Sequence, residues 1–225
     1  LNTDDELESV TAAEIWNGAN GAVVGDEIIQ FKTATLIGAG TYRLSGLQRG
    51  RLGTDHETGG HGSGERFILL GDLSAIERIV DPISLRNASR FYRGVSLYQD
   101  VAAVTSQTFT NTCAALKPWS PVDIAGARDG GNNLTVTWTR RSRIPFSLFF
   151  AVAPLGEDAE AYEVDVYNAG WTAVLRTITG LSSETAAYSA ANQTADGLTP
   201  GNPVNVAVFQ ISVAVGRGTG RRATI

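Results

Sequence analysis

Hydrophobic and polar positions alternate most clearly in the second half of the chain. Residues 134–138 place Leu134, Val136 and Trp138 on one face of a strand, because neighbouring side chains of a β-strand point to opposite sides. The same pattern predicts further strands over residues 162–166, 174–178, 204–212 and 222–225. Short strands at this spacing predict a β-sandwich or a β-barrel.

The first half alternates less regularly, and its elements are predicted mainly from turn signals. Gly25 and Asp26 separate two apolar runs, residues 22–24 and 27–32, and glycine at the first turn position favours a tight type II′ hairpin. Further strands are predicted over residues 35–37, 42–47, 65–70, 76–80 and 107–110, and short helices over residues 4–15 and 97–105. The whole chain is therefore expected to be all-β with little helix.

A change of character near residue 118 divides the chain. Two prolines, Pro118 and Pro121, stand within four residues and favour an extended connector, because proline disfavours the helical conformation of the residue before it. We therefore predict two domains. Residues 1–117 are expected to form a β-barrel or β-sandwich, and residues 118–225 a second β-sandwich.

Composition argues against several functional classes. The net charge of −5 over 225 residues argues against general nucleic-acid binding, which requires a basic surface. The single cysteine, Cys113, excludes an internal disulfide framework. No apolar run approaches the ~20 residues of a membrane-spanning helix, so no membrane span is expected.

Two histidines, His56 and His61, stand in a glycine-rich stretch over residues 56–64. A zinc-protease helix needs histidines at i and i+4, whereas this i, i+5 spacing separates them by roughly 140° on a helix. The intervening glycines would weaken any helix. We predict a loop between strands in which His56 and His61 are candidates for surface contact. A metal or glycan contact is the alternative interpretation.

Motifs of catalysis and cofactor binding are missing from the sequence. It contains no nucleophile elbow, phosphate-binding loop or dinucleotide fingerprint. We therefore expect neither catalytic residues nor a cofactor, and no enzymatic activity.

A basic segment and an apolar segment are further candidates for contact with a partner. Arg140 and Arg141 belong either to a solvated strand end or to an interface. Phe146, Phe149 and Phe150 either pack onto their own core or form an exposed patch, which on a soluble protein usually marks a binding surface. The hypothesis is that these phenylalanines contact a neighbouring subunit or domain.

The strand pattern of residues 118–225 resembles a fibronectin type III domain. The features that carry this resemblance are Pro121 and Val122 as the opening of strand A, Trp138 as the core tryptophan of strand B, residues 160–164 as strand C, and residues 204–212 and 215–218 as strand F and its turn. The tyrosine usual early in strand F has no counterpart, and Val204 or a neighbour takes that place. The resemblance implies a divergent fibronectin type III-like sandwich.

Several segments in order along the chain resemble the C-terminal region of the large tail-tip proteins of gene transfer agents and related long-tailed phages. They are residues 17–20, 25–31, 44–54, 64–70, 208–212 and 215–218. This resemblance implies a structural protein of a virion tail, in a tail tip or baseplate, that assembles as a homotrimer with other tail proteins. It also implies a position near the host surface, with a glycan or protein of that surface as a further partner.

A carbohydrate-binding module of a secreted enzyme or adhesin is the alternative function. Exposed aromatic rings stack on sugar rings, and Trp16, Tyr98, Trp119 and Trp171 are the candidates. Two or three of these rings on one exposed face would favour this alternative. Glycan binding is also compatible with a tail-tip protein.

Overall fold

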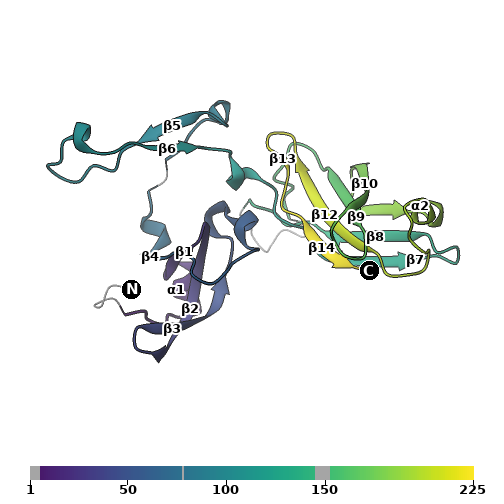
Figure 1. Ribbon diagram of the computed structural model, residues 1–225, viewed down its shortest axis with the longest axis horizontal. Coiled ribbons are helices and arrows are strands. Elements are labelled where there is room, and N and C mark those ends of the chain that lie inside the picture. The colour runs from purple at the N-terminus through teal and green to yellow at the C-terminus, as the bar shows by residue number, and fades with distance from the viewer. Residues whose placement is uncertain (1–5, 78, 145–152) are drawn as a thin grey trace. The chain divides into compact units, whose positions relative to one another are not determined.

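The structure is a computed structural model that describes residues 6–77, 79–144 and 153–225 (Figure 1). The chain divides into two compact units, Leu1–Ala115 and Leu116–Ile225, called here the N-terminal and C-terminal units. Both are built from antiparallel strands, so the predicted all-β class is confirmed. Neither described helix has the length and apolar character needed to cross a membrane.

Four antiparallel strands form the sheet of the N-terminal unit, in the order β3-β2-β1-β4. Their bounds are β1 (Gly21–Val24), β2 (Glu27–Gly38), β3 (Thr41–Gln48) and β4 (Phe67–Gly71). The predicted turn pairs Val24 with Glu27 and holds Gly25 at φ 59°, a conformation that glycine adopts without steric cost. Strand β2 continues through residues 35–37, so the two predicted hairpins share one long strand.

The core of this sheet lies on the face that alternate residues of β2 present. Its buried members are Leu7, Ala22, Ile29 and Phe31. Helix α1 (Ala12–Trp16) occupies only the end of the helix predicted over residues 4–15. It begins at a capping box, in which Thr11 and Glu14 each satisfy a backbone N–H of the other.

Residues 79–112, called here the arm, contain a ribbon of two antiparallel strands, β5 (Ser89–Tyr92) and β6 (Gln107–Thr110). Strand β6 was predicted with these bounds, whereas β5 was missed. The strand predicted over residues 76–80 is wrong, because the described residues of that stretch form no strand. The preceding strand, β4, ends at Gly71, because the φ of 74° at this glycine lies outside the β-strand region of backbone conformation.

Within the described part of the N-terminal unit, β3 and β4 are each paired on one side only. The unit therefore contains an open sheet and a separate ribbon, where a barrel or sandwich was expected. Short 3-10 helices connect the strands, at Arg51–Gly53, Asp55–Glu57, Leu73–Ala75, Ile83–Leu85, Val101–Ala103 and Ala114–Leu116. Only one of these short turns, at residues 101–103, lies within the helix predicted over residues 97–105.

Two sheets form the sandwich of the C-terminal unit. One has the order β11-β8-β7, and the other has the order β10-β9-β12-β13 with β14 also paired to β12. The bounds are β7 (Val122–Arg128), β8 (Leu134–Thr139), β9 (Tyr162–Tyr167), β10 (Val174–Leu181), β11 (Thr185–Tyr188), β12 (Asn205–Ser212), β13 (Gly216–Arg217) and β14 (Arg221–Thr224), with helix α2 (Ala190–Ala195) between β11 and β12. This strand order is that of a fibronectin type III sandwich, so the predicted C-terminal fold is confirmed. Strand β11 and helix α2 were missed.

The inner faces of both sheets supply the core of the sandwich. From the smaller sheet, Leu134, Val136 and Trp138 are buried while the residues between them are exposed, as the alternation predicted. Trp138 packs edge-to-face on Tyr162 of the larger sheet, with ring centroids 5.2 Å apart. The other buried members are Val164, Val166, Ala186, Tyr188, Val204, Val206 and Val208.

Replacing Gly218 with alanine is expected to destabilise the C-terminal unit by about 1–3 kcal/mol, the usual effect of overpacking. An added Cβ would lie 2.5 Å from the carbonyl oxygen of Pro118 and 2.9 Å from that of Gln210, and backbone cannot move aside easily. Gly130→Ala is the matched control, because its Cβ would enter open space. Urea unfolding followed through amide signals of β12 measures both. Equal stability of the two variants would contradict the expectation.

Candidate functional site

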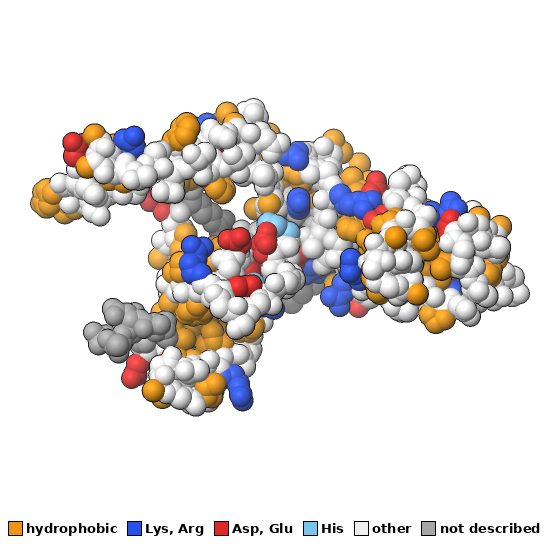
Figure 2. Space-filling view, in the orientation of Figure 1, with side chains coloured by type: hydrophobic (Ala, Val, Ile, Leu, Met, Phe, Trp, Pro, Cys, Tyr) orange, Lys and Arg blue, Asp and Glu red, His pale blue; other side chains and the backbone are white. Residues whose placement is uncertain are grey.

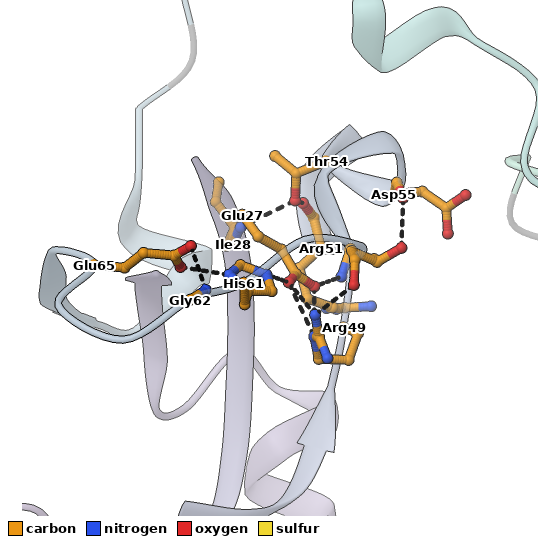
Figure 3. Close-up of polar contacts among 11 residues, drawn as sticks. Glu27, Ile28, Arg49, Arg51, Thr54, Asp55, His61, Gly62 and Glu65 are labelled. Carbon is orange, nitrogen blue, oxygen red and sulfur yellow. Dashed lines mark hydrogen bonds and ion pairs between the residues drawn. The ribbon is translucent and has the colours of Figure 1, made fainter. Parts of the chain in front are cut away.

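Glu27 is the centre of a polar cluster at the beginning of β2 (Figure 3), and its side chain is completely buried. Arg49, directly after β3, donates from Nε to Oε1 at 2.8 Å and from Nη2 to Oε2 at 2.6 Å. The backbone N–H of Gly50 donates to Oε1 at 2.6 Å. Such forked contacts from arginine are the strong form of hydrogen bond to a carboxylate, and they offset the cost of burying this charge.

His61 joins the cluster from the glycine-rich stretch. Its Nε2 lies 2.6 Å from Oε2 of Glu27, and its Nδ1 lies 2.6 Å from Oε2 of Glu65. The backbone N–H of Gly62 donates to the other oxygen of Glu65 at 2.8 Å. The ring of His61 therefore bridges two carboxylates that stand 38 positions apart in the sequence, at 27 and 65.

These contacts shift the pKa of each partner. Hydrogen bonds to Glu65 and then to Glu27 raise the pKa of His61, and the same bond from His61 lowers the pKa of Glu65. Burial acts to raise the pKa of Glu27, but the hydrogen bonds from Arg49, Gly50 and His61 together outweigh it and leave this pKa below its usual value. All of these shifts favour the charged forms of the three side chains.

His56 has different surroundings from His61. Its Nε2 lies 3.2 Å from Oε1 of its neighbour Glu57. In the described ranges, no three side chains of His, Cys, Asp or Glu are grouped so that they could hold a metal ion. The structure thus gives His61 a role inside the fold, in addition to the surface contact predicted for it.

Arg140 and Arg141 also have partners within their own unit. Arg140 donates to a carboxylate oxygen of Glu160 at 3.2 Å and to the carbonyl of Ala153 at 2.6 Å. Arg141 lies over the ring of Trp119 at 5.4 Å and donates to the carbonyl of Ser120 at 2.8 Å. Both side chains therefore attach connecting segments to the sandwich. The third group of candidates, Phe146, Phe149 and Phe150, lies outside the described residues.

The arm carries the most extensive set of exposed apolar side chains, shown in orange in Figure 2. No described residue between Leu73 and Pro118 is buried. Phe91 and Phe109 are 75% and 57% exposed, and the strand register places them on opposite faces of the ribbon. The other exposed apolar side chains of the arm are Ile79, Val80, Ile83, Val95, Leu97, Tyr98 and Val101.

The four aromatic candidates for sugar stacking have different surroundings. Trp16 and Tyr98 are exposed, at 72% and 98%. Trp119 is covered by Arg141, and Trp171 packs on a tyrosine, Tyr167, with ring centroids 5.2 Å apart. Arg222 lies over both rings of that pair, 5.3 Å from the tyrosine and 5.0 Å from the tryptophan. The rings in the C-terminal unit are thus engaged by arginines of their own unit.

Sequence reasoning identified His61 but missed Glu27, Arg49 and Glu65. A signal for Glu27 was present, because it precedes Ile29 and Phe31 at the period of two and so lies on the buried face of β2. A carboxylate on a buried face requires a cationic partner. The pattern could not identify that partner, since Arg49 reaches Glu27 only through the pairing of β2 with β3.

Comparison with known proteins finds one family model that matches part of the chain, and several solved structures of low sequence identity. Residues 1–68 match the family described as Rcc01698-like, C-terminal. No curated protein is similar enough in sequence to count as a relative.

The similar solved structures share little sequence with the chain. Domains d3–d4 of the rat CD45 extracellular region are 14% identical, with a TM-score of 0.34 over 88% of this chain and 93% of that one. The FN1–FN3 domains of chicken CNTN1 are 12% identical, with a TM-score of 0.32 over 96% and 59%. The FN5 domain of Drosophila Lar is 13% identical, with a TM-score of 0.29 over 48% and 95%.

Proposed function

We propose that this chain is a non-enzymatic structural component of a phage-like tail tip or baseplate, in which the arm packs against other tail proteins or further copies of the chain. The arm is the observation that carries the proposal. A ribbon of two strands is at best marginally stable in water by itself. Apolar side chains on both of its faces need a partner on each side, and a multi-subunit assembly supplies such surroundings.

Two further observations support this proposal. The match of residues 1–68 to the Rcc01698-like, C-terminal family agrees with the resemblance to tail-tip proteins of gene transfer agents. The clustered charges at Glu27, Arg140 and Arg141 are engaged in holding the fold together, which suits a rigid building block. Contact with a host-surface glycan or protein is proposed as a second role of the same assembly, because sheet-built modules display loops at fixed geometry.

Variants Phe91→Ser and Phe109→Ser are expected to reduce incorporation of the chain into particles by about tenfold or more. Burial of one phenylalanine contributes about 1.5–3 kcal/mol, and 1.4 kcal/mol corresponds to a factor of ten. Val213→Ser, which removes an apolar side chain that is 75% exposed on the C-terminal unit, is the matched control. Quantitative mass spectrometry of purified particles from cells carrying each variant measures the chain per particle.

The same particles test the location of the wild-type chain. Gold-labelled antibodies against the chain are expected to mark the distal end of the tail in electron micrographs. Particles that assemble fully and contain no copy of the chain would overturn the proposal. Equal incorporation of Phe91→Ser, Phe109→Ser and Val213→Ser would show that the arm is not the surface that contacts other tail proteins.

A further inference from the structure

The glycine-rich loop over residues 59–64 is attached to the N-terminal sheet through very few side chains. Beside Gly59, Gly60, Gly62 and Gly64 the space is open, because a methyl group added at any of them would meet no other atom within 4 Å. Arg49 holds the beginning of the loop by donating to the carbonyl of Thr58 at 2.8 Å. Beyond that point, the loop contacts the sheet through His61 and lies against Glu65 through Gly62.

The two contacts of His61 have a chemical requirement. A neutral imidazole has one N–H donor and one unprotonated nitrogen, whereas the imidazolium has two donors. Both ring nitrogens of His61 face carboxylate oxygens at 2.6 Å, and an ionised carboxylate only accepts. Both contacts are therefore hydrogen bonds only when the ring is protonated. When the ring loses one proton, one of the two contacts places an unprotonated ring nitrogen against a carboxylate oxygen. Both of these atoms are acceptors, so that contact is no longer a hydrogen bond.

The charges around His61 determine which group leaves when the proton is lost. Glu27 keeps its partners Arg49 and Gly50, so it remains an ionised, hydrogen-bonded carboxylate. His61 has no comparable second set of contacts among the described residues. Charged and titratable groups surround His61 from four directions. Asp26 and Glu27 belong to the β1–β2 turn and the beginning of β2, and Arg49 follows β3. Glu57 belongs to the 3-10 helix at Asp55–Glu57, and Glu65 precedes β4.

We propose that His61 is a pH-sensitive latch, which as the imidazolium holds the 59–64 loop against Glu27 and which releases the loop when it loses a proton. In the closed position the loop forms part of the wall of a hollow of about 160 Å³, because Gly59, Gly60 and His61 line it together with the acidic residues Asp26, Glu57 and Glu65. Release of the loop removes that part of the wall. The latch goes beyond the role in tail-tip assembly and does not depend on it.

The direction of the pH dependence follows from the contacts. The pKa of His61 is raised in the closed loop from its ordinary value of 6.5, so the contribution of His61 to closure is fully present below 6.5 and is lost as the pH rises through the raised value. The pKa of Glu65 is lowered, so its contribution is present above 4.5 and is lost as the pH falls through the lowered value. The loop is thus closed between these two limits.

Hydrogen exchange of the full chain tests the latch. Protection of the Gly62 amide, corrected for the intrinsic pH dependence of exchange, is expected to fall by about tenfold per pH unit above 6.5 and to level off at the pKa of His61. An NMR titration of the imidazole signals measures that pKa in the same sample. In His61→Gln the protection is expected to be lower and to show no change with pH above 6.5, because Glu65 then accepts from Gly62 without being held by the imidazolium. His56→Gln is the matched control that retains the wild-type profile.

A second variant keeps the test decisive if His61→Gln fails to fold. Glu65→Gln preserves the shape of a partly exposed side chain but removes its charge, so it is expected to lower the pKa of His61. The pH at which protection levels off must then move down by the same amount. If the pKa of His61 moves but the pH at which Gly62 protection levels off does not, the proposed latch is wrong. Constant protection across the wild-type titration would overturn it as well.

Discussion

Replacement of Trp138 with alanine is expected to lower the free energy of unfolding of the C-terminal unit by about 4 kcal/mol. Removing a large aromatic side chain from a core forfeits its transfer free energy and leaves a cavity, which together amount to about 3–5 kcal/mol. Trp138 is only 4% exposed and contacts Tyr162 edge-to-face across the two sheets. Its loss therefore weakens the contact that holds one sheet against the other.

Urea unfolding followed through amide signals of β9 and β12 measures the effect without relying on tryptophan fluorescence. Trp138→Phe is the matched variant, because it retains a ring beside Tyr162, and it is expected to be clearly less destabilising than alanine. Removal of the exposed Trp16 ring should leave this transition unchanged. A loss below about 1 kcal/mol for Trp138→Ala, the effect of an ordinary substitution, would contradict its place in the core.

Replacement of Glu27 with alanine is expected to destabilise the N-terminal unit by about 2–3 kcal/mol. Removing one partner of a buried ion pair typically costs 3–5 kcal/mol, and water lowers this figure here because the side chain of Arg49 is 39% exposed. The substitution also leaves the Gly50 N–H without its acceptor and frees His61 from the sheet. The beginning of β2, the segment after β3 and the glycine-rich loop thus lose the side chain that connects them.

Two controls separate the buried charge from a general effect of losing a carboxylate. Glu27→Gln keeps the shape and one acceptor oxygen, so an intermediate loss is expected. Glu8→Ala removes an exposed carboxylate of the same unit, and such surface changes are usually within about 0.5 kcal/mol. Unfolding is measured through amide signals of β1 and β2. Equal losses for Glu8→Ala and Glu27→Ala would contradict the central role of Glu27.

Most strands of the sandwich were predicted, because the alternation of their apolar and polar residues follows the alternation of their buried and exposed positions. In β8 the exposed and buried positions alternate without exception, so a local pattern contains the needed information. The turn at Gly25 was equally local, since the backbone conformation there depends on one residue. Strand β5 was missed because its two apolar residues, Phe91 and Tyr92, are adjacent and break the alternation, whereas the weak alternation of residues 107–110 was enough to identify β6.

The polar cluster could be predicted only in part. The glycine-rich loop and His61 were recognised from the sequence, but a surface contact was the role predicted for His61, with a metal or glycan contact as the alternative. Of the observed partners of His61, Glu65 follows four residues later, whereas Glu27 lies 34 positions earlier, at the beginning of β2. Local spacing contains no information about the contact with Glu27, which the fold of the whole unit brings about.

The sequence by itself determined the all-β class, most of the sandwich strands and the tight turn before β2, because these depend on side-chain alternation and on the conformational freedom of single residues. Only the tertiary structure decided that Glu27 is buried beside Arg49 and that His61 bridges two carboxylates. It also decided that the arm exposes apolar side chains on both faces. These features depend on which strands become neighbours, a property of the whole fold rather than of any one segment.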